Sequence, residues 1–253
     1  MSIETASSQT GHLYLVGVGP GDPELMTYKA VRILTDAKVW AVPKAHENGT
    51  SSALQIAGQM VPSNGRKILE LCFPMKKVFL GQDIDAHLLQ AWGKGADEVI
   101  TYLDQGKDVA FPTLGDATLY STAFYLLPMI LERRPQTRVT VVPGITAMAA
   151  CAASQSSPLA LGDDVLAVVP AAFEDDRLRH ILTSLDAVVL MKVYRRLDAL
   201  IDLLTELGLV DNAVLIERSG MPDERVYTDI RQARGQKLHY FSTMLIRKKQ
   251  VHM

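Results

Sequence analysis

The sequence has little of the residue chemistry that metal sites and covalent catalysis need. It contains two cysteines and six histidines in 253 residues, and they are scattered rather than grouped at metal-ligand spacing. It has no Gly-x-Ser-x-Gly turn and no phosphate loop ending in Gly-Lys-Ser/Thr. Ser51 and Ser121 lack an identifiable base, so we expect capping or surface roles for both. The sequence therefore predicts neither a metal site nor a covalent intermediate.

Long apolar runs and an excess of one charge are also missing. Apolar residues make up 48% and charged residues 21%, with a formal net charge of −2, which gives no general attraction to nucleic acid or anionic membrane. No apolar stretch approaches the ~20 residues of a membrane span. Residues 1–12 lack the basic start and apolar run of a secretory signal. We expect a cytoplasmic protein in which Cys72 and Cys151 are buried, free thiols.

What the sequence does contain is a glycine-rich loop directly after a strand. Apolar residues from Leu13 run into the turn Gly17-Val-Gly-Pro-Gly-Asp22, and a helical pattern follows at once. A dinucleotide fingerprint needs glycine at the first, third and sixth positions, but the sixth position here is Asp22. A carboxylate would repel a pyrophosphate, and proline removes a donor N–H. The loop favours a ligand with a neutral or positive centre.

Asp22 has two interpretations. Asp22 followed by Pro23 is a favoured start for a helix, so the carboxylate is expected either to cap that helix or to contact the ligand. The residues alone do not decide between the two.

Periodicity predicts an alternating α/β chain. A strand, a glycine loop, a helix and a second strand open it, which implies a parallel sheet with a right-handed crossover. Residues 74–82 show no clear pattern and are expected to form a loop. Helices are expected over residues 24–37, 53–60, 83–105, 147–153, 174–184 and 197–207, and strands over 38–43, 67–73, 138–142, 165–169, 187–191, 213–216 and 240–247. A short strand is also expected before Gly115-Asp116, followed by a helix that contains Tyr120, Phe124, Leu127 and Ile130.

Three of the expected strands end in glycine turns. The first turn is Gly17 to Asp22, the second is Gly115-Asp116, and the third is Pro143-Gly144. In an open parallel sheet the carboxyl ends of the strands form the edge where ligands bind. Composition changes over residues 154–164, so we expect two α/β domains, 1–153 and 154–253, with a ligand crevice between them.

The set of turns resembles that of a known family, the tetrapyrrole methylases. Residues 16–27 resemble the family's opening motif, Gly115-Asp116 its Gly-Asp turn, and residues 142–147 its Pro-Gly-Ile-Thr-Ala segment. Residues 113–122, 189–193, 217–225 and 240–242 look like the branch that methylates C20 of precorrin-2. The resemblance covers about residues 12 to 249, with the motifs in the right order.

The resemblance implies two α/β domains with a cofactor cleft between them and transfer of a methyl group from S-adenosylmethionine to C20 of precorrin-2. The products would be precorrin-3A, in cobalamin biosynthesis, and S-adenosylhomocysteine. Because the electron-rich macrocycle supplies the nucleophile, the protein's task is to align the reactants and exclude water. The acceptor of the departing proton is unidentified, so no catalytic residue is named. A homodimer is also implied.

Alternatives remain at this point. The substrate could be cobalt-loaded rather than metal-free, or a same-fold methylase could act on RNA or a protein side chain. Near-neutral charge and the lack of a basic–aromatic patch argue against RNA. A non-enzymatic sensor or chaperone that binds S-adenosylmethionine is a further possibility, and a nicotinamide oxidoreductase is disfavoured by the glycine spacing.

The resemblance also implies site residues. Substrate carboxylates call for cations at the mouth of the cleft, since arginine forms paired hydrogen bonds with carboxylate, although each cation could equally be a solvated surface charge. Two positions depart from the family: Ala117 stands where proline is usual, and Tyr194 stands near an expected small residue. The cofactor would be lined by Pro20, Leu114, Gly115, Asp116, Leu119, Thr146, Ala147, Met191, Ser219 and Gly220. The substrate would meet Asp22, Lys44, Lys192, Arg195, Arg196 and Arg218.

Overall fold

The computed structural model describes residues 10–46, 48–74, 83–170 and 176–249. The expected loop at 74–82 therefore lies, apart from its first residue, outside the described residues. The chain divides into two compact units, Met1–Thr146 and Ala147–Met253. This division falls at the start of helix α5 (Ala147–Ser154), whereas the sequence analysis places the boundary near its end.

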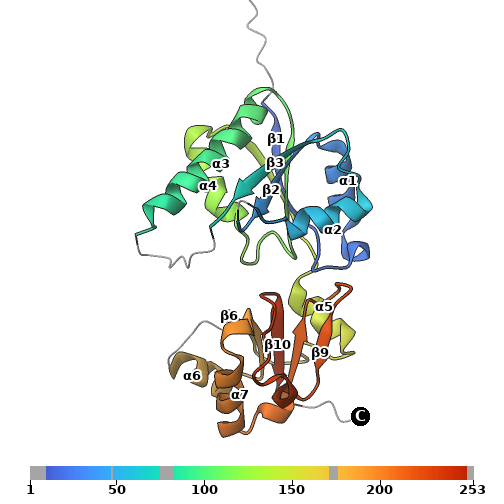
Figure 1. Ribbon diagram of the computed structural model, residues 1–253, viewed down its shortest axis with the longest axis vertical. Helices are drawn as coiled ribbons and strands as arrows, with labels where there is room; N and C mark the ends of the chain where they lie inside the picture. Colours follow the sequence, from blue (N-terminus) through green and yellow to red (C-terminus); the bar gives the residue numbers. More distant parts are fainter. Residues whose placement is uncertain (1–9, 47, 75–82, 171–175, 250–253) are drawn as a thin grey trace, which may run out of the picture. The chain divides into compact units, whose positions relative to one another are not determined.

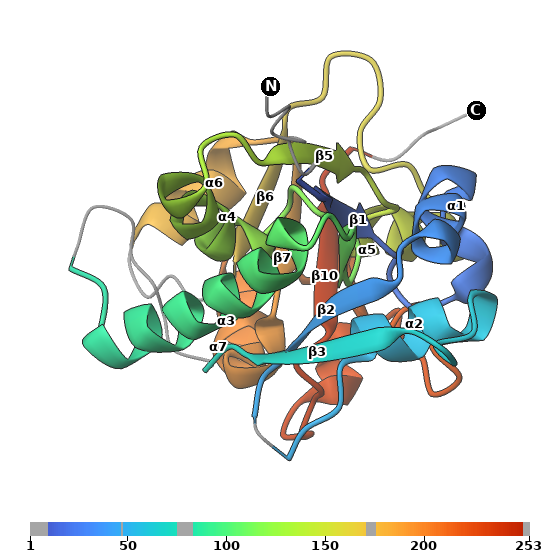
Figure 2. The ribbon, with the colours of Figure 1, turned by 90° about the horizontal axis from the view of Figure 1, so that it is seen from above.

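The first unit is a parallel α/β sheet with helices on both faces. Figure 1 and Figure 2 show α1 and α2 on one face and α3 and α4 on the other. All strand pairs in the order β3-β2-β4-β1-β5 are parallel. The strands are β1 (His12–Gly17), β2 (Val39–Lys44), β3 (Lys67–Cys72), β4 (Val109–Thr113) and β5 (Arg138–Val142). The helices are α1 (Tyr28–Asp36), α2 (Ser52–Met60), α3 (Ala86–Asp104) and α4 (Ala123–Arg133).

The core of this unit follows from the strand period of two. Leu13 and Leu15 on β1, and Phe111 on β4, point to the same side and pack with Trp92 of α3 and Leu126 of α4. Burying each such side chain contributes roughly 1.5–3 kcal/mol. The central strands β1 and β4 are thereby fixed, and their carboxyl ends, which carry two of the three glycine turns, are held in register.

The helix expected over residues 24–37 is shorter than predicted. Residues Pro23–Leu25 form a separate 3-10 turn, and α1 begins only at Tyr28. Met26 and Thr27 are extended, with ψ of 136° and 146°, which breaks the helix between the two segments. The Thr27 hydroxyl then accepts from the Ala30 N–H at 3.1 Å and starts α1 afresh.

The second unit has a mixed sheet in the order β6-β7-β10-β8-β9. Only β6 and β7 pair in parallel, and the other three pairs are antiparallel. Figure 1 shows α6 and α7 together on one side of the sheet and α5 on the other. The elements are β6 (Leu166–Pro170), α6 (Asp176–Ser184), β7 (Ala187–Met191), α7 (Leu197–Glu206), β8 (Ala213–Glu217), β9 (Arg225–Tyr227) and β10 (Ser242–Arg247), with 3-10 turns at Val193–Arg195, Val210–Asn212 and Ile230–Ala233.

The position of β10 determines how the second unit presents its loops. β10 runs antiparallel between β7 and β8, so its amino end lies beside their carboxyl ends. The segment that leads into β10 therefore sits between the segments that follow β7 and β8. Over the described residues, no helix combines the length and the apolarity that crossing a membrane requires.

Candidate functional site

The glycine loops after β1 and β4 are joined by backbone hydrogen bonds. The Gly19 N–H donates to the Gly115 carbonyl at 3.2 Å, and the Gly115 N–H donates to the Gly19 carbonyl at 2.7 Å. Both residues lie in the left-handed region, at φ of 78° and 74°, where a side chain is strained. These two glycines therefore meet a backbone requirement, and the two loops form one surface at the carboxyl edge of the sheet.

The third loop, after β5, packs directly on the other two. A Cβ added to Gly144 would lie 2.3 Å from the Gly115 carbonyl oxygen and 2.9 Å from the Gly17 Cα. One added to Gly17 would lie 2.7 Å from the Gly144 nitrogen. These contacts are to backbone atoms, which cannot rotate away as a side chain can. Gly17 and Gly144 are needed for close approach of the loops, and the expected gathering of three turns at one edge is confirmed.

Asp116 links the second and third loops. Its carboxylate accepts the Gly144 N–H and the Thr118 N–H, each at 2.7 Å, and also the Thr118 hydroxyl. Burial raises the pKa of this carboxyl, but the hydrogen bonds from Thr118 and Gly144 outweigh burial, so the pKa lies below its ordinary value. Asp116 is 8% exposed and ionised, and it holds the β5 loop against the β4 loop.

The other candidates of the first unit differ in their environment. Pro20 is buried, while Leu114, Leu119 and Thr146 are half-buried and follow β1, β4 and β5. Lys44, at the end of β2, forms an ion pair with Glu70 at 3.0 Å. The structure thus brings the cofactor candidates of this unit together at the edge formed by the three loops.

Asp22 acts as a cap in the structure. Its Oδ1 accepts the Glu24 N–H at 2.8 Å and closes the 3-10 turn at Pro23–Leu25. Two serines also accept backbone N–H groups: Ser51 Oγ accepts the Leu54 N–H, and Ser121 Oγ accepts the Ala123 N–H. A capping or surface role was expected for both serines; Ser51 is the N-cap of α2, while Ser121 is buried and bonds the first turn of α4, whose N-cap is Thr122.

Ala117 and Cys151 are buried, while Cys72 is only partly buried. Ala117 is completely buried against the first unit's core. Cys72 and Cys151 are both free thiols, as expected, although Cys72 is only partly buried. Burial raises the pKa of Cys151 to about 11, and its thiol contacts Ser219. Ser219, one of the cofactor candidates, is therefore a buried neighbour of α5.

In the second unit, the two strands that flank β10 are each followed by a basic residue in an unusual conformation. Lys192 comes after β7 and Arg218 after β8, and their φ values are 63° and 55°. The Lys192 N–H donates to the Ser242 carbonyl at 2.8 Å, and the Arg218 N–H donates to the Phe241 carbonyl at 2.7 Å. Residues in this region cost about 1–3 kcal/mol each and are common at ligand sites. The segment leading into β10 is held between these two basic residues.

Aromatic rings and cations gather around that segment. The Lys192 Nζ lies 5.4 Å from the centroid of the Tyr240 ring, and the Arg195 guanidinium lies 5.1 Å from the centroid of the Tyr194 ring. The Tyr194 and Tyr240 rings meet edge to face at 5.5 Å. Tyr194 is half-buried in this cluster rather than turned to solvent. Met191 and Arg196 are partly exposed nearby in sequence, and Gly220, with φ of 72°, lies in the loop after β8 that begins at Arg218.

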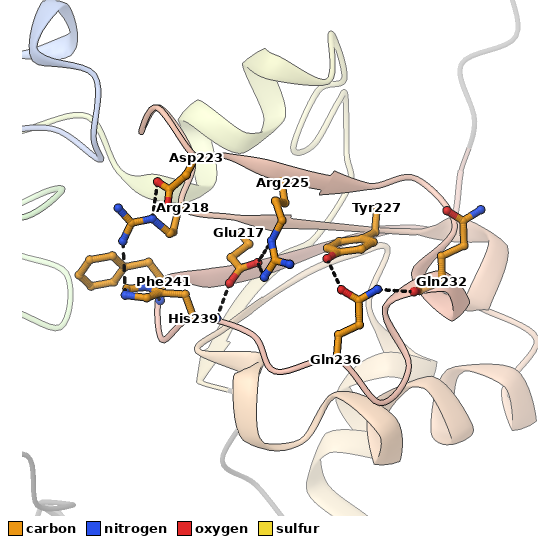
Figure 3. Close-up of polar contacts among 9 residues, drawn as sticks. All are labelled: Glu217, Arg218, Asp223, Arg225, Tyr227, Gln232, Gln236, His239 and Phe241. Atoms are coloured by element: carbon orange, nitrogen blue, oxygen red, sulfur yellow. Dashed lines mark hydrogen bonds and ion pairs between the residues drawn. The ribbon is translucent and has the colours of Figure 1, made fainter.

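The polar side chains along β8 and its loop form two ion pairs (Figure 3). Glu217 is buried, with a 2% exposed side chain, and accepts Arg225 Nε at 2.7 Å and the His239 N–H. Arg218 Nε donates to Asp223 at 2.6 Å and lowers the pKa of that carboxyl. Sequence reasoning singled out Arg218 but missed His239, since a lone histidine before a strand has no motif to mark it.

The donor set fits a cofactor with a positive or neutral centre. The three loops of the first unit, 17–22, 114–119 and 143–146, contain two aspartates and no lysine or arginine. Their backbone groups and carboxylates suit a sulfonium or an amine better than a phosphate, which needs N–H donors or cations. Among the described residues, no group of three or more histidine, cysteine or acidic side chains could hold a metal ion.

Comparisons with known proteins agree with this chemistry. Residues 12–233 match the family model of the Tetrapyrrole (Corrin/Porphyrin) Methylases. The chain is 34% identical to a cobalt-precorrin-2 C(20)-methyltransferase of Salmonella typhimurium, over 94% of this chain and 97% of the relative. It is 35% identical to a precorrin-2 C(20)-methyltransferase of Sinorhizobium, over 93% and 95%.

Solved structures show the same fold at lower identity. A cobalt precorrin-4 methyltransferase matches with a TM-score of 0.68 and 20% identity, over 93% of this chain and 94% of the other. A uroporphyrin-III C-methyltransferase of Thermus thermophilus, crystallised with S-adenosylhomocysteine, matches with a TM-score of 0.64 and 20% identity, over 94% and 92%. These likenesses establish the α/β fold.

Proposed function

Because the chain belongs to the tetrapyrrole methylases, it is a methyltransferase that uses S-adenosylmethionine, and we propose that it methylates C20 of precorrin-2. One observation carries the choice of substrate. The relatives from Salmonella typhimurium and Sinorhizobium, at 34% and 35% identity over nearly the whole of both chains, are both named C(20)-methyltransferases of precorrin-2, with or without cobalt.

The residues proposed to hold the cofactor lie on the three glycine loops of the first unit and among the candidates of the second unit. Backbone groups of Leu114 to Asp116 and of Thr146 would bind the polar parts of S-adenosylmethionine, and Pro20 and Leu119 would supply apolar contact. Asp116 has its hydrogen bonds committed to Thr118 and Gly144, so its main role is to fix the loops. Ala147, Met191, Ser219 and Gly220 would complete the cofactor site.

The chain's contribution to the reaction is positioning. S-adenosylmethionine supplies the methyl group, and the macrocycle supplies the attacking carbon, so the protein's residues need only align the two and exclude water. This arrangement is consistent with the structural positions of Ser51 and Ser121, which bond the first turns of α2 and α4, and with the buried Cys151.

The residues proposed to meet the substrate's carboxylates are mainly those of the second unit. Lys192 and Arg195 lie near tyrosine rings and Arg218 lies beside the His239 ring, which suits a flat macrocycle with anionic side chains. Arg196 is a further candidate. Lys44 is engaged with Glu70 and Asp22 is a cap, so both are weaker candidates.

Cobalt-loaded precorrin-2 is the second candidate substrate. The Salmonella typhimurium relative is named for the cobalt form, and so is a probable cobalt-precorrin-2 C(20)-methyltransferase of Methanocaldococcus jannaschii, at 32% identity. The Sinorhizobium relative is named for the metal-free form, which we place first.

We further propose that the cofactor and substrate bind between two domains, with a boundary near residue 153, and that the protein is a cytoplasmic homodimer. The family resemblance supports the cleft and the dimer, the change of composition over residues 154–164 supports the boundary, and the two free cysteines support the cytoplasmic location. Light scattering coupled to size-exclusion chromatography tests the dimer, and a monomer at micromolar concentration would contradict it.

Methyl transfer tests the proposed function. The purified protein is incubated under anaerobic conditions with labelled S-adenosylmethionine and precorrin-2, and separately with the cobalt form. We expect one labelled methyl group on at least one of the two macrocycles, detected by mass spectrometry. If neither macrocycle gains a methyl group while S-adenosylmethionine still binds, a sensor or a methylase of another substrate becomes the better explanation.

A further inference from the structure

His239 and Arg218 face each other at the edge of the second unit, just before β10. Arg218 Nη1 lies 3.4 Å from His239 Nε2, and Figure 3 shows the two side chains directed toward one another. The distance suggests a hydrogen bond, but a bond of this kind requires the imidazole nitrogen to act as the acceptor. The hydrogen bond at the other ring nitrogen, Nδ1, determines whether Nε2 can accept.

The backbone determines the tautomer of His239. The Phe241 N–H donates to His239 Nδ1 at 3.0 Å, and a backbone N–H is always a donor. Nδ1 must therefore be the unprotonated nitrogen of the ring. In the neutral imidazole the proton then sits on Nε2, which makes Nε2 a donor. The 3.4 Å contact joins two donors, the Nε2–H and the Nη1 group, so it is not a hydrogen bond between them.

His239 remains neutral in this setting. Burial lowers the pKa of His239 and Arg218 lowers it further, while Glu217 and Asp223 act in the opposite direction without reversing the shift. Protonation would also place a hydrogen on Nδ1, against the Phe241 N–H. Nε2 is consequently a fixed N–H donor near neutral pH.

The nearby carboxylates of the β8 loop are committed elsewhere. Asp223 binds the Nε side of Arg218 at 2.6 Å, and Glu217 is turned to Arg225 and to the His239 backbone. The Nη1 group and the Nε2–H are thus two neighbouring N–H donors whose nitrogens lie 3.4 Å apart. Two adjacent N–H donors, one of them charged, can both donate to one oxygen of a carboxylate.

Aromatic rings border this pair of donors. The Phe241 ring lies 4.8 Å from the His239 ring between centroids, and the Tyr240 ring lies 5.6 Å from Phe241. Lys192 Nζ adds a further cation at 5.4 Å from the Tyr240 ring. Apolar faces beside anion-binding donors suit a flat ring system that carries acidic side chains.

We propose that the Nε2–H of His239 and the Nη1 group of Arg218 together bind one peripheral carboxylate of the tetrapyrrole substrate. The proposal rests on the proposed function for the identity of the ligand. It makes His239 a substrate-binding residue, and it assigns the Nδ1 contact with Phe241 the task of keeping the Nε2 proton in place.

Two substitutions separate the two sides of the imidazole. His239→Asn keeps an acceptor near the Nδ1 position, where an asparagine oxygen accepts the N–H two residues on, and removes the Nε2 donor. His239→Gln keeps an N–H near the Nε2 position and loses the Nδ1 acceptor. His180→Asn, on α6, is the matched control, since His180 is exposed and its Nδ1 lies 3.4 Å from the Ser184 hydroxyl. Arg218→Lys keeps the charge but loses the planar pair of amino groups.

The measurement is the dissociation constant of precorrin-2, or of its cobalt form, for each variant, followed by changes in the macrocycle's visible absorbance. We expect binding to weaken about tenfold in His239→Asn and in Arg218→Lys, because each variant loses a hydrogen bond to a charged group. His239→Gln should stay within about threefold of the wild type, and His180→Asn should be unchanged. Affinity for S-adenosylhomocysteine should be the same in all of them.

The methyl ester of the same macrocycle provides the internal test. It has no carboxylates, so wild type and His239→Asn should bind it equally. Equal binding of the acid by His239→Asn and wild type, or an equal loss in His239→Gln and His239→Asn, would overturn the proposal. If the His239 variants do not fold, Arg218→Lys decides alone by the same criterion. If the wild type binds precorrin-2 or its cobalt form but transfers no methyl group, the proposed function is wrong and the carboxylate site is still supported. If the wild type binds neither macrocycle, both proposals are wrong.

Discussion

Replacing Asp116 by asparagine tests whether the three glycine loops are held together as the structure indicates. The carboxylate accepts three donors, the Gly144 N–H at 2.7 Å, the Thr118 N–H at 2.7 Å and the Thr118 hydroxyl. An amide has one oxygen, so it can satisfy the Thr118 side only by turning its NH₂ group toward the Gly144 N–H. Two donors then face each other, and one hydrogen bond to a charged group is lost.

The size of the effect follows from that loss. A hydrogen bond to a charged acceptor contributes about 1.5–3 kcal/mol, and the 8% exposure of Asp116 leaves little room for water to replace it. We expect the free energy of unfolding in urea to fall by about 2 kcal/mol. Because Leu114, Gly115 and Thr146 sit on the loops that Asp116 joins, the dissociation constant of S-adenosylhomocysteine should rise about tenfold.

For Asp116→Asn, titration calorimetry measures the dissociation constant of S-adenosylhomocysteine, and urea unfolding measures the free energy of unfolding. The matched control is Asp36→Asn, the same chemical change at an exposed aspartate in the last turn of α1, and it should leave both quantities within error. Asp116 has a lowered pKa, so its contribution is present above the pKa of the unfolded state and disappears as pH falls through the folded-state pKa. Unchanged affinity and unchanged stability in Asp116→Asn would refute the role given to this carboxylate.

Two further predictions concern the loops and the second unit. Gly144→Ala should lower the free energy of unfolding by about 3 kcal/mol, because its Cβ would lie 2.3 Å from the Gly115 carbonyl oxygen. Gly58→Ala, in an open site on α2, is the control and should raise the free energy of unfolding by up to about 1 kcal/mol. Similar values for the two variants would show that the loops are not closely packed. The Asp164 pKa is lowered to about 2 by the Leu161 N–H, Arg247 and Lys249, so the wild type should lose more thermal stability than Asp164→Asn between pH 4 and pH 2; parallel melting curves would contradict this.

The parallel half of the fold could be predicted from the sequence, and the mixed half only in part. β7 was expected over 187–191 and is found at Ala187–Met191, because a continuous run of apolar β-formers marks a buried strand. β9 was not expected, since three residues, two of them exposed, carry no periodicity. β10 pairs antiparallel with both β7 and β8, and no local sequence pattern encodes this arrangement, which depends on tertiary contacts.

The candidate site divides in the same way. The glycine turns could be located because glycine reports a backbone requirement, and Gly19 and Gly115 indeed lie at positive φ. The same requirement at Lys192 and Arg218 is invisible in sequence, because neither residue type favours that conformation. Asp116 links two loops through the Gly144 N–H, and Gly144 lies far along the chain from it. The role proposed for His239 depends on Arg218 and the Phe241 N–H, which only the fold brings to it.

The most direct test of the proposed activity is the position of the transferred methyl group. The protein is incubated with S-adenosylmethionine carrying a ¹³C-labelled methyl group and with precorrin-2 or its cobalt form, and the product is analysed by ¹³C NMR. We expect a single labelled methyl group, bonded to C20 of the macrocycle. A labelled methyl group on any other carbon, or no transfer to either macrocycle by a protein that binds S-adenosylmethionine, would contradict C20 methylation.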